Sequence, residues 1–270
     1  MVDPLSLIAL GAAVGGAAGK FVEKAWDSGE KWLSSYFQNH RERARETATV
    51  NSAQFLRKLG VRLEHLENTG QLSSVEIEAS LEHPEFSVTL QKAMLSAAQT
   101  DNEMKHQLLS DLVADHLHAK PESLLALVSK IACDVVSEIT PNQLKLLGLI
   151  STLRHLSSGQ LQTPRDAAVW LEKVLAPYHS CSLTTLDVLH LQALACIQQT
   201  PFAIDMWSVF AQKNAQGVDV SFRDTGIYSH IASLWPKLQT MQLSSVGQLL
   251  GVEVIGIETG IEVPLHGWDI

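Results

Sequence analysis

The pattern of hydrophobic and polar positions predicts a mostly helical protein. Through most of the chain, apolar residues recur every three or four positions, as they do along the buried face of a helix. Helix starts are indicated by Ser73 three residues before Glu76, and by Thr140, Thr163 and Thr200, each directly before a proline. These signals divide the chain into about ten helices, which we expect to form a bundle-like protein.

The pattern changes near the C-terminus. Two short runs rich in valine and isoleucine, residues 252–257 and 261–265, flank a Thr-Gly pair at Thr259 and Gly260. Short apolar runs on either side of a glycine-containing turn are typical of a β-hairpin. The sequence therefore predicts a small C-terminal hairpin that packs against the helices of the second half.

The N-terminus carries an unusual uncharged segment from Pro4 to Gly19. Gly11, Gly15 and Gly19 recur every fourth residue, so they form a small-residue strip on one side of a helix, which lets helices approach closely in lipid. At ~1.5 Å per residue the segment is about 24 Å long, shorter than the ~20 residues that a lone membrane span needs. Two interpretations remain: a helix packed in a groove of its own domain, or a segment that enters a membrane conditionally. The lack of basic residues before Leu5 disfavours a secretory signal.

The same segment superficially resembles a phosphate-binding loop. A Walker A motif requires glycine where Val14 stands and serine or threonine where Phe21 follows Lys20. A dinucleotide-binding glycine motif also requires glycine at position 14. The sequence therefore excludes nucleotide binding at this place.

An amphipathic and aromatic stretch follows. Five of the sixteen aromatic residues of the chain are Phe21, Trp26, Trp32, Tyr36 and Phe37. Tryptophan and tyrosine beside an apolar segment are typical of a membrane interface, whereas an aromatic stripe at helical spacing also forms the core-facing side of a helix. After this stretch, three arginines at positions 41, 43 and 45 alternate with glutamates, a pattern that predicts a solvated helix face.

Composition limits the classes of function and the compartment. The formal net charge of −9 argues against a nucleic-acid partner. Three widely spaced cysteines fit a reducing compartment better than a disulfide framework, so we expect a cytoplasmic protein or one on the inner face of the cell membrane. We expect three parts: residues 1–46 with the glycine-rich segment and the aromatic helix, a helical domain over 47–138, and a second over 139–270.

Candidate chemical groups are few. Asp111, Asp115 and His118 share one helix face, a geometry compatible with a metal site, but the leucines beside them indicate that this face is simply the hydrated one. His179 and Cys181 have no second pair at zinc-ligand spacing. His190 and Cys196, six residues apart, fall on different sides of one predicted helix. We therefore expect no catalytic residues, no metal and no cofactor.

Three segments resemble a loose group of all-helical bacterial proteins associated with abortive infection. They are GAAVGGAAGKFVEKAW at residues 11–26, ITPNQLKLL at residues 139–147 and LSSVGQLL at residues 243–250. The resemblance covers patches at both ends of the chain and brings no catalytic residues. It implies a role in bacterial defence against phage, in which a helical body acts with a partner protein.

These observations favour a non-enzymatic phage-defence protein, a sensor or an effector, whose N-terminal segment engages a membrane or self-associates. The alternative is a soluble helical adaptor that acts through protein partners and keeps its N-terminal helix in the core. We expect a membrane lipid or a second copy of the chain, and a protein partner, as ligands. The residues that we expect to form the membrane or self-association surface are Gly11, Gly15, Gly19, Trp26, Trp32, Tyr36 and Phe37.

Overall fold

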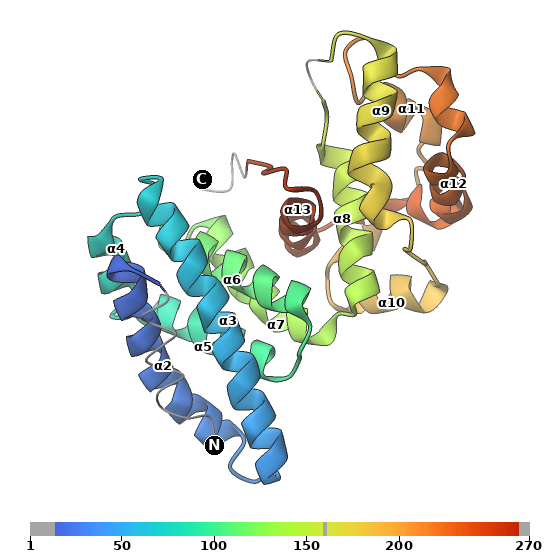
Figure 1. Ribbon diagram of the computed structural model, residues 1–270. Coiled ribbons are helices and arrows are strands. Elements are labelled where there is room, and N and C mark those ends of the chain that lie inside the picture. The colour runs from blue at the N-terminus through green and yellow to red at the C-terminus, as the bar shows by residue number, and fades with distance from the viewer. Residues whose placement is uncertain (1–13, 159–160, 265–270) are drawn as a thin grey trace. The chain divides into compact units, whose positions relative to one another are not determined.

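The computed structural model describes residues 14–158 and 161–264, and this part of the chain is mainly helical (Figure 1). It contains twelve α-helices, two short 3₁₀ helices and one antiparallel sheet of two strands. The expectation of a mostly helical protein with a small sheet near the C-terminus is confirmed. The chain divides into two compact units, the first ending at Glu138 and the second running from Ile139 to Pro264.

Unit 1 consists of six described helices. Their bounds are α2 Gly16–Tyr36, α3 Glu42–Asn68, α4 Ser74–Ser80, α5 Pro84–Ala98, α6 Glu103–His118 and α7 Leu124–Glu138. Helix α2 packs along α3 and also contacts α4 and α5, while α6 and α7 complete the other side. Because α3 spans residues 42–68, the boundary expected after residue 46 falls inside a helix that belongs wholly to unit 1.

The close approach of α2 and α3 depends on a glycine. A Cβ atom on Gly60 of α3 would lie 2.7 Å from a methyl group of Val22 and 3.1 Å from one of Val14. Val14 and Val22 are both buried. The N-terminal helix therefore lies in van der Waals contact with the longest helix of its own unit, as a helix of the core does.

Unit 2 contains the remaining elements. Their bounds are α8 Pro141–His155, α9 Pro164–Leu175, η1 Ala176–Tyr178, α10 Thr185–Ala193, β1 Ile197–Gln199, α11 Met206–Ala211, η2 Val220–Asp224, α12 Gly226–Leu238, β2 Met241–Leu243 and α13 Ser245–Thr259. Its main contact joins α8 and α13. A Cβ atom on Gly251 of α13 would lie 2.6 Å from the backbone oxygen of Leu147 of α8, so this crossing requires glycine.

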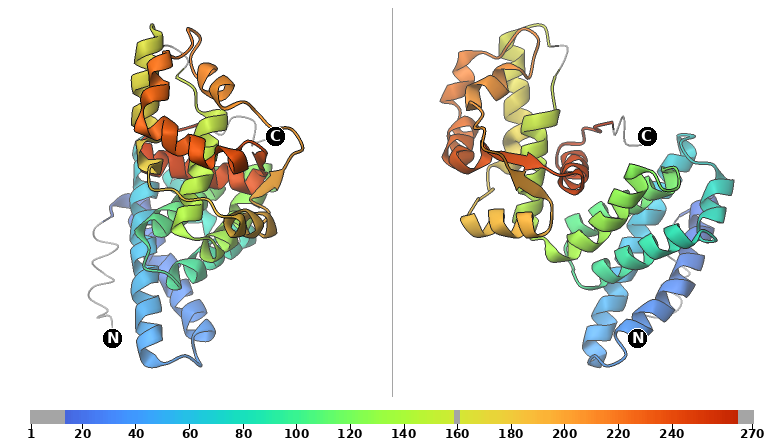
Figure 2. Two further views of the ribbon diagram at one scale, coloured as in Figure 1. Left: turned by 90° about the vertical axis from the view of Figure 1, so that its right-hand side faces the viewer. Right: turned by 180° about the vertical axis from the view of Figure 1, so that it is seen from behind.

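The residues assigned to the C-terminal hairpin were wrong. Residues 252–257 belong to helix α13, and the two strands are instead β1 and β2, which pair antiparallel with Ile197 opposite Leu243 (Figure 2). The Thr-Gly pair is a helix end, because Gly260 adopts the left-handed conformation (φ 71°) that terminates many helices. The short apolar run did not show helical spacing because this part of α13 is buried on most of its circumference.

Candidate functional site at the α2–α3 hairpin

The glycines of the N-terminal strip have different surroundings. Gly11 lies outside the described residues. Gly15 is exposed, and its N–H donates a hydrogen bond of 3.1 Å to a carboxylate oxygen of Glu64 on α3. Gly19 is buried within unit 1. Of the two described glycines of the strip, one is therefore buried and the other is hydrogen-bonded to α3.

The aromatic residues of α2 separate into two groups. Phe21, Trp26 and Phe37 are buried, and the Phe21 ring meets that of Phe86 on α5 edge to face, with centroids 6.0 Å apart. Trp32 is partly exposed and Tyr36 is 53% exposed. Only these last two of the expected aromatic surface residues reach solvent, and both lie in the last turns of α2.

The end of the α2–α3 hairpin extends past the core. Every residue from Gln38 to Thr47 is exposed, and burial on α3 begins only at Ala48. Figures 1 and 2 show this end of the hairpin projecting beyond the other helices of unit 1. Tyr36 packs edge to face on Phe37 and stacks on His40, with ring centroids 5.0 and 6.5 Å away. We call residues 36–47 the hairpin tip.

The hairpin tip also carries three exposed cations, Arg41, Arg43 and Arg45. Arg41 is the N-cap residue of α3, and its side chain makes no capping hydrogen bond. In the part of the chain that the structure describes, no ion pair with a carboxylate is recorded for these three guanidinium groups. The arrangement presents aromatic rings and arginines together to solvent, which suits contact with a polar, negatively charged surface.

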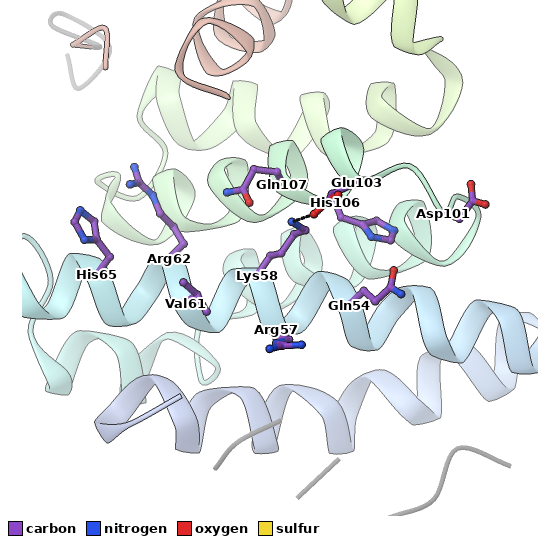
Figure 3. Close-up of a pocket in the computed structure, with 10 residues that line it drawn as sticks. All are labelled: Gln54, Arg57, Lys58, Val61, Arg62, His65, Asp101, Glu103, His106 and Gln107. Atoms are coloured by element: carbon purple, nitrogen blue, oxygen red, sulfur yellow. Dashed lines mark hydrogen bonds and ion pairs between the residues drawn. The ribbon is translucent and has the colours of Figure 1, made fainter. Parts of the chain in front are cut away.

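A separate groove of about 860 Å³ lies between α3 and the start of α6 (Figure 3). Two of its cations are already paired: Lys58 Nζ lies 3.1 Å from a carboxylate oxygen of Glu103, and Arg62 Nε lies 3.5 Å from one of Asp111. The buried His106 bonds through Nε2 to the carbonyl oxygen of Thr100 at 2.8 Å. An anion that binds Lys58 or Arg62 in this groove would have to displace a carboxylate, so the groove is a weaker binding candidate than the hairpin tip.

The acidic face of α6 has a structural explanation. Besides Arg62, Asp111 accepts hydrogen bonds of 3.2 Å from the side-chain nitrogen of Gln107. His118, the third residue of the candidate metal site with Asp111 and Asp115, is exposed. Across residues 14–158 and 161–264, no group of three or more histidine, cysteine and acidic side chains is arranged to hold a metal ion.

The cysteines are buried in apolar surroundings. Burial raises the pKa of Cys181 to about 11 and that of Cys196 to about 12, and it raises the pKa of Cys133 further. All three therefore remain protonated thiols at neutral pH, which makes them poor nucleophiles. His190 is engaged elsewhere, because its Nδ1 lies 3.1 Å from the side-chain oxygen of Gln143.

No helix within the described residues has the length and hydropathy needed to cross a bilayer.

Comparison with known proteins gives one match. The model of a family described as ":-like" matches residues 19–229, which covers α2 through most of unit 2. Searches of curated proteins and of solved structures found no match.

Proposed function

We propose a function for this chain, which belongs to the ":-like" family matched over residues 19–229. It is a non-enzymatic bacterial defence protein that the α2–α3 hairpin holds against the inner face of the cell membrane. The observation that carries the proposal is the aromatic end of α2 outside the core, where Trp32 is partly exposed and Tyr36 is 53% exposed. Tryptophan and tyrosine are the side chains that favour the interfacial region of a bilayer, because each combines an apolar ring with a polar group.

The burial of α2 supports peripheral contact over insertion of this helix. Phe21, Val22 and Leu33 are buried, and each large apolar side chain contributes roughly 1.5 to 3 kcal/mol through burial. Pulling α2 out of unit 1 would also break the glycine-dependent contact with Gly60. We therefore assign the membrane contact to the hairpin tip and the last turns of α2, with the helix still folded onto α3.

Liposome flotation tests the proposal. The samples are the full chain, the double variant Trp32→Ala/Tyr36→Ala and a chain lacking residues 1–13, each with a thermal melt as a folding control. We expect the full chain and the truncated chain to float, and the double variant to stay at the bottom of the gradient with a nearly unchanged melt. Loss of flotation on truncation alone would assign the contact to residues 1–13 instead, and full flotation of the double variant would contradict a contact made through these aromatic rings.

The defence role is supported by the resemblance to abortive-infection proteins alone and needs its own assay. Phage plating on cells that express the full chain should fall relative to an empty control, and plating on cells with Trp32→Ala/Tyr36→Ala should recover. Equal plating on all three would contradict a defence role.

A soluble adaptor is the second candidate, favoured by an exposed apolar stripe on α7. Leu124, Leu127 and Ile131 recur on one helix face and are 46%, 46% and 50% exposed. A soluble adaptor that uses this stripe for a protein partner should not float with liposomes and should lose its cellular phenotype in Leu127→Glu. Sedimentation velocity of the full chain and of Leu127→Glu separates self-association through the stripe from contact with a different protein.

A further inference from the structure

We infer that Arg41, Arg43 and Arg45 form a binding site for anionic phospholipid headgroups, so that the hairpin tip selects negatively charged membrane over neutral membrane. The inference rests on the proposed peripheral function and names the ligand of that surface. Guanidinium groups bind phosphate oxygens through two parallel N–H donors, which makes arginine well suited to a phospholipid surface.

The three arginines occupy positions that do not help the helix they begin. The N-terminal end of a helix carries a partial positive charge, and cations there are unfavourable. An N-cap residue is usually serine, threonine, aspartate or asparagine, because their side chains accept a hydrogen bond from the first turn. Arg41 accepts none, and Arg43 and Arg45 follow within the first turns. A requirement other than helix stability therefore explains these cations.

The arrangement suits contact through the end of the hairpin. Successive residues of a helix are about 100° apart, so Arg43 and Arg45 point to roughly opposite sides of the α3 axis. The Cα atoms of Arg43 and Arg45 are only ~3 Å apart along that axis, and Arg41 directly precedes the helix. The three side chains are therefore distributed around the end of α3 rather than along one of its side faces, which suits a surface placed across that end.

The net charge of the whole chain opposes contact with an anionic bilayer unless cations are concentrated locally. At a formal net charge of −9 the protein is repelled by an anionic bilayer. Screening limits that repulsion to about 8 Å in physiological salt, so the groups nearest the membrane decide the orientation. At the tip, three arginines and His40 oppose only Glu42 and Glu46. Because the hairpin tip projects beyond the other helices of unit 1, it can approach an anionic bilayer ahead of the rest of that unit.

The aromatic residues at the end of α2 and the arginines of the hairpin tip contribute differently to binding. Tyr36 and Trp32 supply affinity for any bilayer interface, whereas the arginines distinguish anionic from neutral headgroups. Each arginine near an anionic surface contributes about five-fold in partitioning, so the three together contribute up to about a hundred-fold.

The test is flotation of the full chain on vesicles of phosphatidylcholine alone and of phosphatidylcholine mixed with phosphatidylglycerol. The variant is Arg41→Gln/Arg43→Gln/Arg45→Gln. The matched control, Arg165→Gln/Lys173→Gln/Lys237→Gln, removes three exposed cations of unit 2 and gives the same net charge. A further variant, Glu42→Gln/Glu46→Gln, removes the two carboxylates of the tip. Thermal melts accompany all four proteins.

We expect the tip variant to lose most of its preference for phosphatidylglycerol, up to about a hundred-fold in partitioning, and the control to keep it. The glutamate variant should bind phosphatidylglycerol vesicles more tightly than the unchanged chain, an outcome that impaired folding cannot produce. High salt should remove the preference in every case.

Three results would overturn the inference. One is an equal loss in the tip variant and the control, which would indicate a general charge effect. Another is unchanged partitioning of the tip variant. The third is displacement of the full chain from the vesicles by duplex DNA that binds it as tightly as the vesicles do, which would indicate a general polyanion site. If the full chain floats on neither kind of vesicle, the proposed peripheral function fails as well. Flotation that the tip variant retains leaves that function intact and rejects only the arginine site.

Discussion

Replacing Phe21 by alanine tests whether α2 is a permanent part of unit 1. Phe21 of α2 is 1% exposed, and its ring meets that of Phe86 on α5 edge to face. Truncating a buried phenylalanine costs about 3 to 5 kcal/mol, because apolar contact is lost and a cavity remains. Tyr36 lies fifteen positions later on the same helix at 53% exposure, so Tyr36→Ala should cost less than about 1 kcal/mol.

Urea unfolding measured by circular dichroism and by tryptophan fluorescence reports the difference. With a slope of about 2 kcal/mol per molar urea, Phe21→Ala should lower the midpoint of the unit 1 transition by about 1.5 to 2.5 M. Tyr36→Ala should leave it within about 0.5 M of the unchanged protein. Similar midpoints for Phe21→Ala and the unchanged protein would refute the placement of α2 in the core and would favour a detachable helix.

Three further predictions concern unit 2 and the thiols. Gly251→Ala should destabilise unit 2 in urea unfolding, because the new Cβ would meet the backbone of α8. Gly256→Ala on the same helix should stabilise unit 2 by up to about 1 kcal/mol, because its new Cβ would have no atom within 4 Å. The opposite order of stabilities would contradict the α8–α13 contact. Burial lowers the pKa of Lys213 to about 8, so between that pH and 10.5 this position holds more protons in the unfolded chain than in the folded one, and Lys213 contributes a rise of at most about 3 kcal/mol to the stability of unit 2. The raised pKa values of Cys181 and Cys196 act in the opposite direction, so the Lys213 contribution is measured as the difference in urea midpoint between the unchanged chain and Lys213→Met across a pH series, and a difference that stays constant with pH would contradict it. Ellman's reagent should react slowly with the native protein and promptly with three thiols after unfolding, whereas a fast native reaction would contradict the burial of the cysteines.

Helix starts governed by short-range hydrogen bonds could be predicted from the sequence. Ser73 with Glu76 forms the expected reciprocal pair of capping hydrogen bonds, and the hydroxyl of Thr163 accepts a bond from the N–H of Asp166. Thr140 also caps its helix, with Gln143 as the reciprocal partner. Each of these interactions spans only three residues, so the local sequence contains all that determines it.

Predictions failed where distant contacts decide the local structure. Thr200 precedes a proline but begins no helix, because its N–H donates to the carbonyl oxygen of Thr240 and so continues the pairing of β1 with β2. Helix α11 begins later, capped by Asp205. The strands themselves are more than forty residues apart in sequence, and each is three residues long, too short for a periodic signal.

The candidate site was only partly visible in the sequence. The aromatic stripe and the three arginines were evident in the sequence. The same helical spacing, however, includes both the buried Trp26 and the exposed Tyr36, so it does not distinguish them. The length of α2 relative to its neighbours decides which aromatic residues extend past the core, and that length depends on tertiary packing. The arginines were interpreted as an ordinary solvated helix face because their position at a helix start, next to Tyr36, requires the structure.

The central claim is that the hairpin tip contacts the membrane while the rest of α2 stays folded onto unit 1. An environment-sensitive fluorophore tests it most directly, because the three native thiols are buried and an introduced cysteine is labelled selectively. The label is placed through Ser35→Cys at the exposed end of α2 or through Glu23→Cys, also exposed on the same helix. On addition of phosphatidylglycerol vesicles, the account predicts a blue-shifted and brighter emission at position 35 and no change at position 23. An equal change at both positions, or a change at position 23 alone, would contradict it.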